Sequence, residues 1–143
     1  SYFDQFPKIK SYMDLMIENA KMKGYVETFF GRRIPIKGIN SKNFQERSFA
    51  ERQSINAPIQ GSAADIIKRA MIKIHNVFQE KNIESKMLLQ VHDELVFECP
   101  KDEINTVSNL IKKEMEQANL PLFPLNIPIV VDFGEADNWS EAH

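Results

Sequence analysis

The feature that most restricts the fold is a pair of short apolar segments set between two amphipathic ones. Residues 86–90 and 95–99 have the composition of strands, and only residues 91–94, which are mostly polar, separate them. The flanking segments, residues 58–81 and 102–118, repeat apolar side chains at helical spacing. Strands joined by so short a connection form an antiparallel hairpin, and helices with one apolar face must cover something. The sequence therefore predicts an α+β fold, in which an antiparallel sheet with this hairpin packs against long helices.

The N-terminal part of the chain predicts another helix and a second hairpin. Apolar side chains recur at helical spacing from Pro7 to Lys23, and Gly24 can end the helix in a left-handed conformation. Residues 25–30 alternate as a short strand, and Gly31-Arg32-Arg33 turns the chain. Residues 34–36 are then expected to return beside that strand.

The remaining predicted elements are a proline-containing helical region and a C-terminal strand. The helical region opens near Ser41, where Asn43 begins a capping-box pattern, and continues to about Asn56. Pro58 has no amide hydrogen to donate, so we expect a kink or the start of a new helix there. Residues 126–133 predict a last strand.

Composition excludes several classes of protein. The chain has 143 residues, of which 43% are hydrophobic, and this suits one globular domain with a core. No apolar run approaches the ~20 residues of a membrane-spanning helix, and the N-terminus lacks the pattern of a signal peptide. The single cysteine, Cys99, provides neither a disulfide framework nor a cysteine-rich zinc site. We expect a cytoplasmic protein with no membrane partner.

Charge is distributed unevenly along the chain. Residues 1–80 contain 13 Lys and Arg against 8 Asp and Glu, whereas residues 81–143 contain 5 against 12. A basic half suits contact with phosphates, and an acidic half suits a divalent cation. Charged faces exposed to solvent explain the same asymmetry, so charge alone does not identify a partner.

Two adjacent carboxylates, Asp93 and Glu94, lie at the predicted tip of the C-terminal hairpin. Such neighbours repel one another unless a cation or hydrogen bonds offset their charge. Mg²⁺ is commonly held by one or two carboxylates together with waters and phosphate oxygens, so this tip could supply part of a magnesium site. For a His-Asp-Glu sequence considered alone, a polar turn facing solvent is the simpler explanation.

Three polar residues, Arg52, Asn56 and Gln60, follow one another at a spacing of four. On a helix this spacing places them on one face, and we call them the polar stripe. Their donors and acceptors suit the minor groove of a duplex, where the acceptor atoms are similar for every base pair. A stripe facing solvent is the alternative.

Several segments resemble motifs of bacterial family A DNA polymerases. The most specific is residues 55–68, with the sequence INAPIQGSAADIIK, and residues 90–96, QVHDELV, resemble that family's third polymerase motif. Residues 25–28 followed by Gly31-Arg32-Arg33 also fit, as does the C-terminal stretch 138–143. These segments occur in the family's order and together span nearly the whole chain.

The resemblance implies a DNA-directed DNA polymerase that adds deoxynucleotides to a primer 3′ end with two Mg²⁺ ions. Asp93 would bind the metal and Glu94 would support it from outside the ligand shell, which makes these two the catalytic residues. His92 would lie near the primer terminus. The polar stripe would contact the primer–template DNA, and deoxynucleoside triphosphates would be the other substrate.

The resemblance also implies how the chain is divided. Residues 1–40 would be the end of the fingers subdomain with a connecting hairpin, and residues 41–143 the C-terminal half of the palm. Two parts of the family's active site, a first metal-binding aspartate and a nucleotide-gripping fingers helix, have no counterpart in this sequence. We therefore expect a fragment that works with the remainder of a polymerase chain and is inactive when isolated.

The sequence departs from the family pattern around the Gly-Arg-Arg turn. Phe30, Pro35 and residues 37–38 differ from what many relatives carry. These departures leave open whether Arg32 and Arg33 contact DNA.

Two other functions remain open at this point. The polar stripe could serve a DNA-binding module without catalysis, whose affinity would fall steeply with salt. A metal-dependent nuclease built on Asp93 and Glu94 would need a third ligand that the sequence does not identify.

Overall fold

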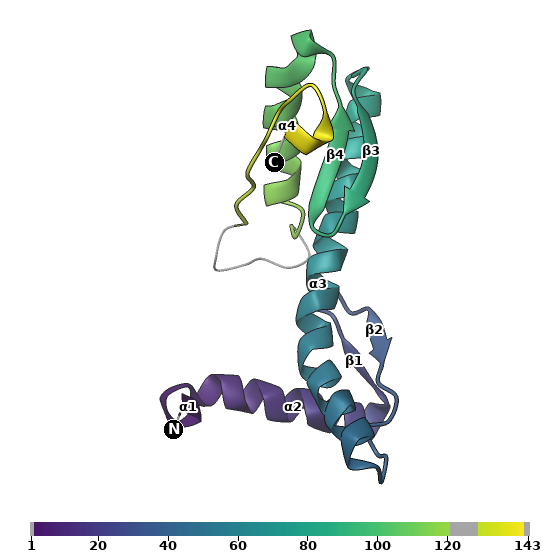
Figure 1. Ribbon diagram of the computed structural model, residues 1–143, viewed down its shortest axis with the longest axis vertical. Coiled ribbons are helices and arrows are strands. Elements are labelled where there is room, and N and C mark those ends of the chain that lie inside the picture. The colour runs from purple at the N-terminus through teal and green to yellow at the C-terminus, as the bar shows by residue number, and fades with distance from the viewer. Residues whose placement is uncertain (1, 121–128, 142–143) are drawn as a thin grey trace. The chain divides into compact units, whose positions relative to one another are not determined.

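The chain forms helices and two small antiparallel hairpins. The computed structural model describes residues 2–120 and 129–141. In chain order and as labelled in Figure 1, the elements are α1 (Tyr2–Gln5), α2 (Pro7–Lys23), β1 (Tyr25–Glu27), β2 (Arg33–Pro35), α3 (Phe44–Glu80), β3 (Lys86–Val91), β4 (Glu94–Glu98), η1 (Lys101–Glu103), α4 (Ile104–Glu116) and η2 (Trp139–Glu141). Helices combined with antiparallel hairpins confirm the predicted α+β class.

The chain divides into two compact units, residues 1–65 and residues 66–143, and α3 contributes residues to both. This boundary differs from residue 40, where the sequence places the end of the fingers. The assignment of residues 1–40 and 41–143 to two polymerase subdomains stays a prediction.

In the first unit, α2 has the predicted bounds. It ends at Gly24, which adopts a left-handed φ of 79°, and the Gly24 amide donates to the Ala20 carbonyl at 2.8 Å. The β1–β2 hairpin follows, with Val26 paired to Ile34. A small core is made of buried residues from these elements, the loop after β2 and α3: Ala20, Val26, Ile36, Ile39 and Ala50.

Helix α3 is continuous over 37 residues, so of the two outcomes predicted at Pro58, a kink or a new helix, the new helix is wrong. It begins at Phe44 rather than near Ser41, because the Asn43 side-chain oxygen accepts the amides of Gln45 and Glu46 at 2.9 and 3.1 Å and so caps the helix. Pro58 removes only one backbone hydrogen bond, the one to the Ser54 carbonyl. Both Ser54 and Pro58 are fully buried, and packing holds the helix together across the proline.

In the second unit, the β3–β4 hairpin and α4 enclose an apolar core with the C-terminal half of α3. The buried members of this core are Ile74, Phe78, Val107 and Ile111. From β4 and the residue that follows it, Leu95, Phe97 and Cys99 pack against them at alternate positions. The predicted hairpin and the predicted helix after it are confirmed, although η1 precedes α4 as a short 3₁₀ turn.

The predicted C-terminal strand is not found where the structure describes it. Residues 126–128 lie outside the described residues, and residues 129–133 form no strand. The Val131 amide donates to the Glu116 carboxylate at 3.3 Å instead of to a neighbouring strand, and Val130 is 74% exposed. An apolar composition without a strand to pair with does not make a sheet.

Across residues 2–120 and 129–141, no helix combines the length and the apolar composition that crossing a bilayer requires. The cytoplasmic location stays a prediction.

Candidate functional site

The hairpin of the second unit ends in a two-residue turn. Strand β3 ends at Val91 and β4 begins at Glu94, and these two residues are paired across the hairpin. His92 and Asp93 therefore form the whole connection, and His92 adopts a left-handed φ of 54°. The Gln90 side-chain amide donates to the His92 carbonyl at 2.9 Å and braces the turn. The structure brings His92, Asp93 and Glu94 together at this tip, which we call the hairpin tip.

All three side chains of the hairpin tip are exposed, whereas the next residues along β4 are half-buried against the apolar core. A rigid base therefore carries carboxylates that solvent and ligands can reach. Their oxygen atoms suit Mg²⁺, which needs only one or two such ligands beside waters and phosphate oxygens. Within the described part of the chain, no three His, Cys, Asp or Glu side chains are close enough to hold a metal ion by themselves. The hairpin tip fits a part of a shared metal site.

The polar stripe lies on α3 in the first unit. Arg52, Asn56 and Gln60 are all exposed, and the unbroken helix keeps them on one face as predicted. The opposite side of the same segment is buried, with Ser54, Pro58 and Ser62 at most 3% exposed. The structure thus presents the stripe to solvent from a helix that is fixed on its other side.

Tyr12 of α2 supports the helix next to the stripe. Its hydroxyl donates to the Ile55 carbonyl at 3.0 Å. Burial raises the pKa of Tyr12 above its ordinary value of 10.0, because the charged phenolate loses solvation there. The hydroxyl therefore keeps its proton, and the hydrogen bond, over the neutral pH range.

The two arginines of the Gly-Arg-Arg turn have different surroundings. The Arg32 Nε donates to the Asp65 Oδ1 of α3 at 2.8 Å. Arg33 instead lies over the Tyr25 ring, 4.6 Å from its centroid, and its side chain is 69% exposed. Sequence reasoning treated the pair alike and missed Asp65 as a partner, because 33 residues separate it from Arg32.

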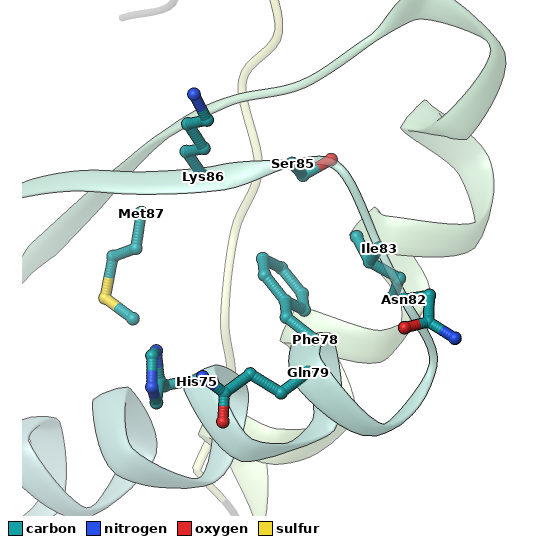
Figure 2. Close-up of a pocket in the computed structure, with 8 residues that line it drawn as sticks. All are labelled: His75, Phe78, Gln79, Asn82, Ile83, Ser85, Lys86 and Met87. Atoms are coloured by element: carbon teal, nitrogen blue, oxygen red, sulfur yellow. The ribbon is translucent and has the colours of Figure 1, made fainter.

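The second unit also has an open hollow of about 600 Å³ between the end of α3 and the start of β3. Figure 2 shows Phe78 and Met87 among its apolar lining residues, with His75, Gln79 and Lys86 among the polar ones. None of the six predicted site residues lines it. The hollow is separate from the hairpin tip.

Comparison with known proteins gives a consistent result. A family model described as DNA polymerase family A matches residues 1–141. DNA polymerase I of Streptococcus pneumoniae serotype 4 is 49% identical over 142 residues, which are 99% of this chain and 16% of that protein. DNA polymerase I of Geobacillus stearothermophilus is 48% identical over 141 residues, with the same coverage.

Among solved structures, the POL domain of Pol1 from M. smegmatis, in complex with DNA primer-template and dNTP, matches with a TM-score of 0.89 and 40% identity. The match covers 99% of this chain and 24% of that one. The chain therefore spans a small part of the proteins that it resembles, 16% of the length of the two curated relatives.

Proposed function

The chain belongs to DNA polymerase family A, and we propose that it is a segment of a DNA-directed DNA polymerase that extends primers with deoxynucleotides. The observation that carries this proposal is the match over residues 1–141, together with 45–49% identity to polymerases. Residues 1–40 are the end of the fingers with a connecting hairpin, and residues 41–143 are the C-terminal half of the palm. The remainder of the polymerase chain is the necessary partner.

The hairpin tip provides the catalytic carboxylates. Asp93 binds the metal, and Glu94 holds the site from outside the ligand shell. Two Mg²⁺ ions bound between Asp93 and the rest of the palm would lower the pKa of the primer 3′-hydroxyl and neutralise the departing pyrophosphate. His92 lies next to Asp93 in the two-residue turn and contacts the primer terminus. The exposure of all three side chains supports these roles, because a metal and two substrates must reach them.

The polar stripe holds the duplex near the primer end. Arg52, Asn56 and Gln60 donate to minor-groove acceptors, whose positions are similar for every correct base pair. A mismatched pair displaces these acceptors, so the stripe distinguishes pair geometry without reading sequence. Its support is the continuous helix and the common exposed face.

The test is nucleotide incorporation by the complete protein on a primed template with Mg²⁺. Asp93→Asn should lower the rate by far more than the ~100-fold typical of a group that only supports a metal ligand, with DNA affinity nearly unchanged. The control is Glu98→Gln, an exposed carboxylate at the far end of β4, which should leave the rate within about twofold because it lies away from the hairpin tip.

Two outcomes would count against the proposal. An Asp93→Asn protein that still extends primers at the normal rate would exclude Asp93 as a metal ligand. A variant that loses DNA binding and incorporation to the same degree would point to misfolding or to a DNA-binding module without catalysis. The isolated chain is a further control, and template-dependent extension by residues 1–143 alone would refute its expected inactivity.

A further inference from the structure

The turn between β1 and β2 is attached to α3 at the end of the polar stripe. The Phe29 amide donates to the Ser62 hydroxyl at 2.8 Å, and the Arg32 Nε donates to the Asp65 carboxylate at 2.8 Å. A guanidinium nitrogen of Arg32 also reaches the Gly61 carbonyl at 3.4 Å. We call these contacts between residues 28–32 and residues 61–65 the turn–helix clamp. All of its members belong to the first unit, where Figure 1 shows β1 and β2 beside α3.

Glycine at position 61 allows the turn and the helix to approach this closely. A Cβ atom at Gly61 would lie 2.8 Å from both the Ile34 Cδ1 and the Thr28 Cγ2. Real Cβ contacts are essentially never that short, so with any larger residue the Ile34 and Thr28 side chains, or the hairpin that carries them, would have to shift. Close contact and hydrogen bonds thus act at the same place.

The turn is also held by hydrogen bonds of its own. The Thr28 hydroxyl accepts the amides of Phe30 and Arg32, both at 3.2 Å. The Thr28 amide donates to the Arg32 carbonyl at 2.9 Å, and Gly31 takes the left-handed φ of 85° that the turn requires. The backbone of Arg32 is therefore fixed, and its side chain starts from a defined position.

The Asp65 carboxylate is largely buried and forms an ion pair within the first unit. Its side chain is only 12% exposed, and its Oδ2 atom is buried without a hydrogen-bond partner among the described residues. Arg32 is the cation bound to the other carboxylate oxygen. Removing Arg32 would leave a buried negative charge uncompensated, which is far more costly than losing an exposed ion pair.

The clamp and the polar stripe occupy opposite sides of α3. Successive helical residues are about 100° apart, so the centre of the stripe lies about 170° from the centre of Gly61, Ser62 and Asp65. Pro58 lies on the same side of the helix as the clamp, and there the backbone hydrogen bond to Ser54 cannot form. Ser54 and Ser62 also bond back to the carbonyls of Ala50 and Pro58, at 2.8 and 2.5 Å, a pattern that bends helices. The segment of α3 that carries the stripe therefore lacks one backbone hydrogen bond and depends on packing for its straightness.

We propose that Arg32 and Asp65 are positioning residues, whose ion pair holds the proline-containing segment of α3 so that the polar stripe meets the minor groove correctly. Arg32, whose side chain is 47% exposed, then binds within the protein. Arg33, which is 69% exposed and 3.9 Å from the Glu27 carboxylate, is the arginine of this turn that faces the DNA backbone. This inference rests on the proposed role of the stripe in binding the primer–template duplex.

The experiment uses the complete protein with Arg32→Ala, Asp65→Ala and the double variant. The rates of extending matched and mismatched primer ends are measured, and their ratio is the main readout, because general loss of folded protein lowers both rates equally. DNA affinity is measured over a series of salt concentrations. Arg33→Ala is the matched control from the same turn, and Arg32→Lys keeps a cation without the planar two-point contact.

We expect each single variant to lower the ratio about tenfold, a size typical of coupling within one ion-pair network. The double variant should lose no more than either single one, and Arg32→Lys should lose less than Arg32→Ala. The slope of log affinity against log salt should stay unchanged for Arg32→Ala, whereas Arg33→Ala should reduce it by about 0.9, the value for one lost phosphate contact.

Arg52→Ala separates this inference from the proposed function. If Arg52→Ala lowers the ratio but Arg32→Ala and Asp65→Ala do not, only the clamp is wrong. If Arg52→Ala leaves the ratio unchanged, the stripe does not sense the primer end, and the inference falls with it. A salt slope reduced by about 0.9 in Arg32→Ala, or additive losses in the double variant, would also overturn the positioning role.

Discussion

The two units present their functional side chains by different physical means. In the first unit the polar stripe depends on a helix that hydrogen bonds, an ion pair and a close glycine contact hold from behind. In the second unit the carboxylates stand on a hairpin whose base is held by an apolar core. Polar contacts fix direction, whereas apolar burial supplies most of the stability. The first unit should therefore be sensitive to single contacts, and the second to loss of volume in its core.

The largest effect should come from emptying the core of the second unit. Ile74 is fully buried, so Ile74→Ala should cost about 2–5 kcal/mol through lost burial and the cavity that it leaves. Amide hydrogen exchange in the complete protein should show faster exchange in α4 and the β3–β4 hairpin, with little change in residues 1–65. Ile72→Ala, at a side chain that is 62% exposed on the same helix, is the control and should change stability by less than about 0.5 kcal/mol. Equal loss of protection in both units would show that they do not respond separately.

A smaller effect is expected from crowding the clamp of the first unit. Gly61→Ala gains about 1 kcal/mol of helix propensity. Overpacking against Ile34 and Thr28 costs about 1–3 kcal/mol, so the net loss should be about 1 kcal/mol. Hydrogen exchange should then increase in residues 54–62 and not in the second unit. In an Ile34→Val background the cost of Gly61→Ala should shrink, because the Cδ1 atom is absent; an unchanged cost would show that this contact is not the cause.

The smallest effect should come from the hydroxyl that supports the stripe. Tyr12→Phe removes one hydrogen bond to the Ile55 carbonyl and should cost about 1 kcal/mol at neutral pH. Because burial raises the pKa of Tyr12 in the folded protein, this residue's stabilising contribution is complete below 10.0 and declines as pH rises through the higher folded-state pKa. Unfolding measured between about pH 8 and about pH 11 should show the wild type approaching the variant at the alkaline end. A difference that grows with pH would contradict this assignment.

Local signals were sufficient for the elements that begin and end with proline, glycine or a capping side chain. Helix α2 begins at Pro7 and is ended by Gly24, as predicted, and Asn43 caps α3. Whether α3 would continue past Pro58 did not follow from local signals, because burial of Pro58 outweighs its local preference. The strand expected at residues 126–133 was predicted from composition, and its described part, residues 129–133, pairs with no strand.

The site residues, too, include some that local signals predicted and some that they did not. The sequence predicted that Arg52, Asn56 and Gln60 share a face, because this follows from the spacing of one helix. It also predicted that Asp93 and Glu94 occupy a hairpin tip, because a short polar connection joins two neighbouring apolar segments. The partnership of Arg32 with Asp65 joins two elements and could not follow from spacing. A glycine inside a helical pattern, Gly61, was the available signal, since it often marks a close approach of another segment.

The two-residue turn of the hairpin tip leaves no room for a change in length. Side chains of a strand alternate between two faces, so one inserted residue before Glu94 would exchange them throughout β4. Leu95 and Phe97 would turn outward, and Val96 and Glu98 would turn toward the core in their place. The number of residues in this turn therefore determines which side chains of β4 face the core. It also determines where on the surface the Asp93 side chain lies.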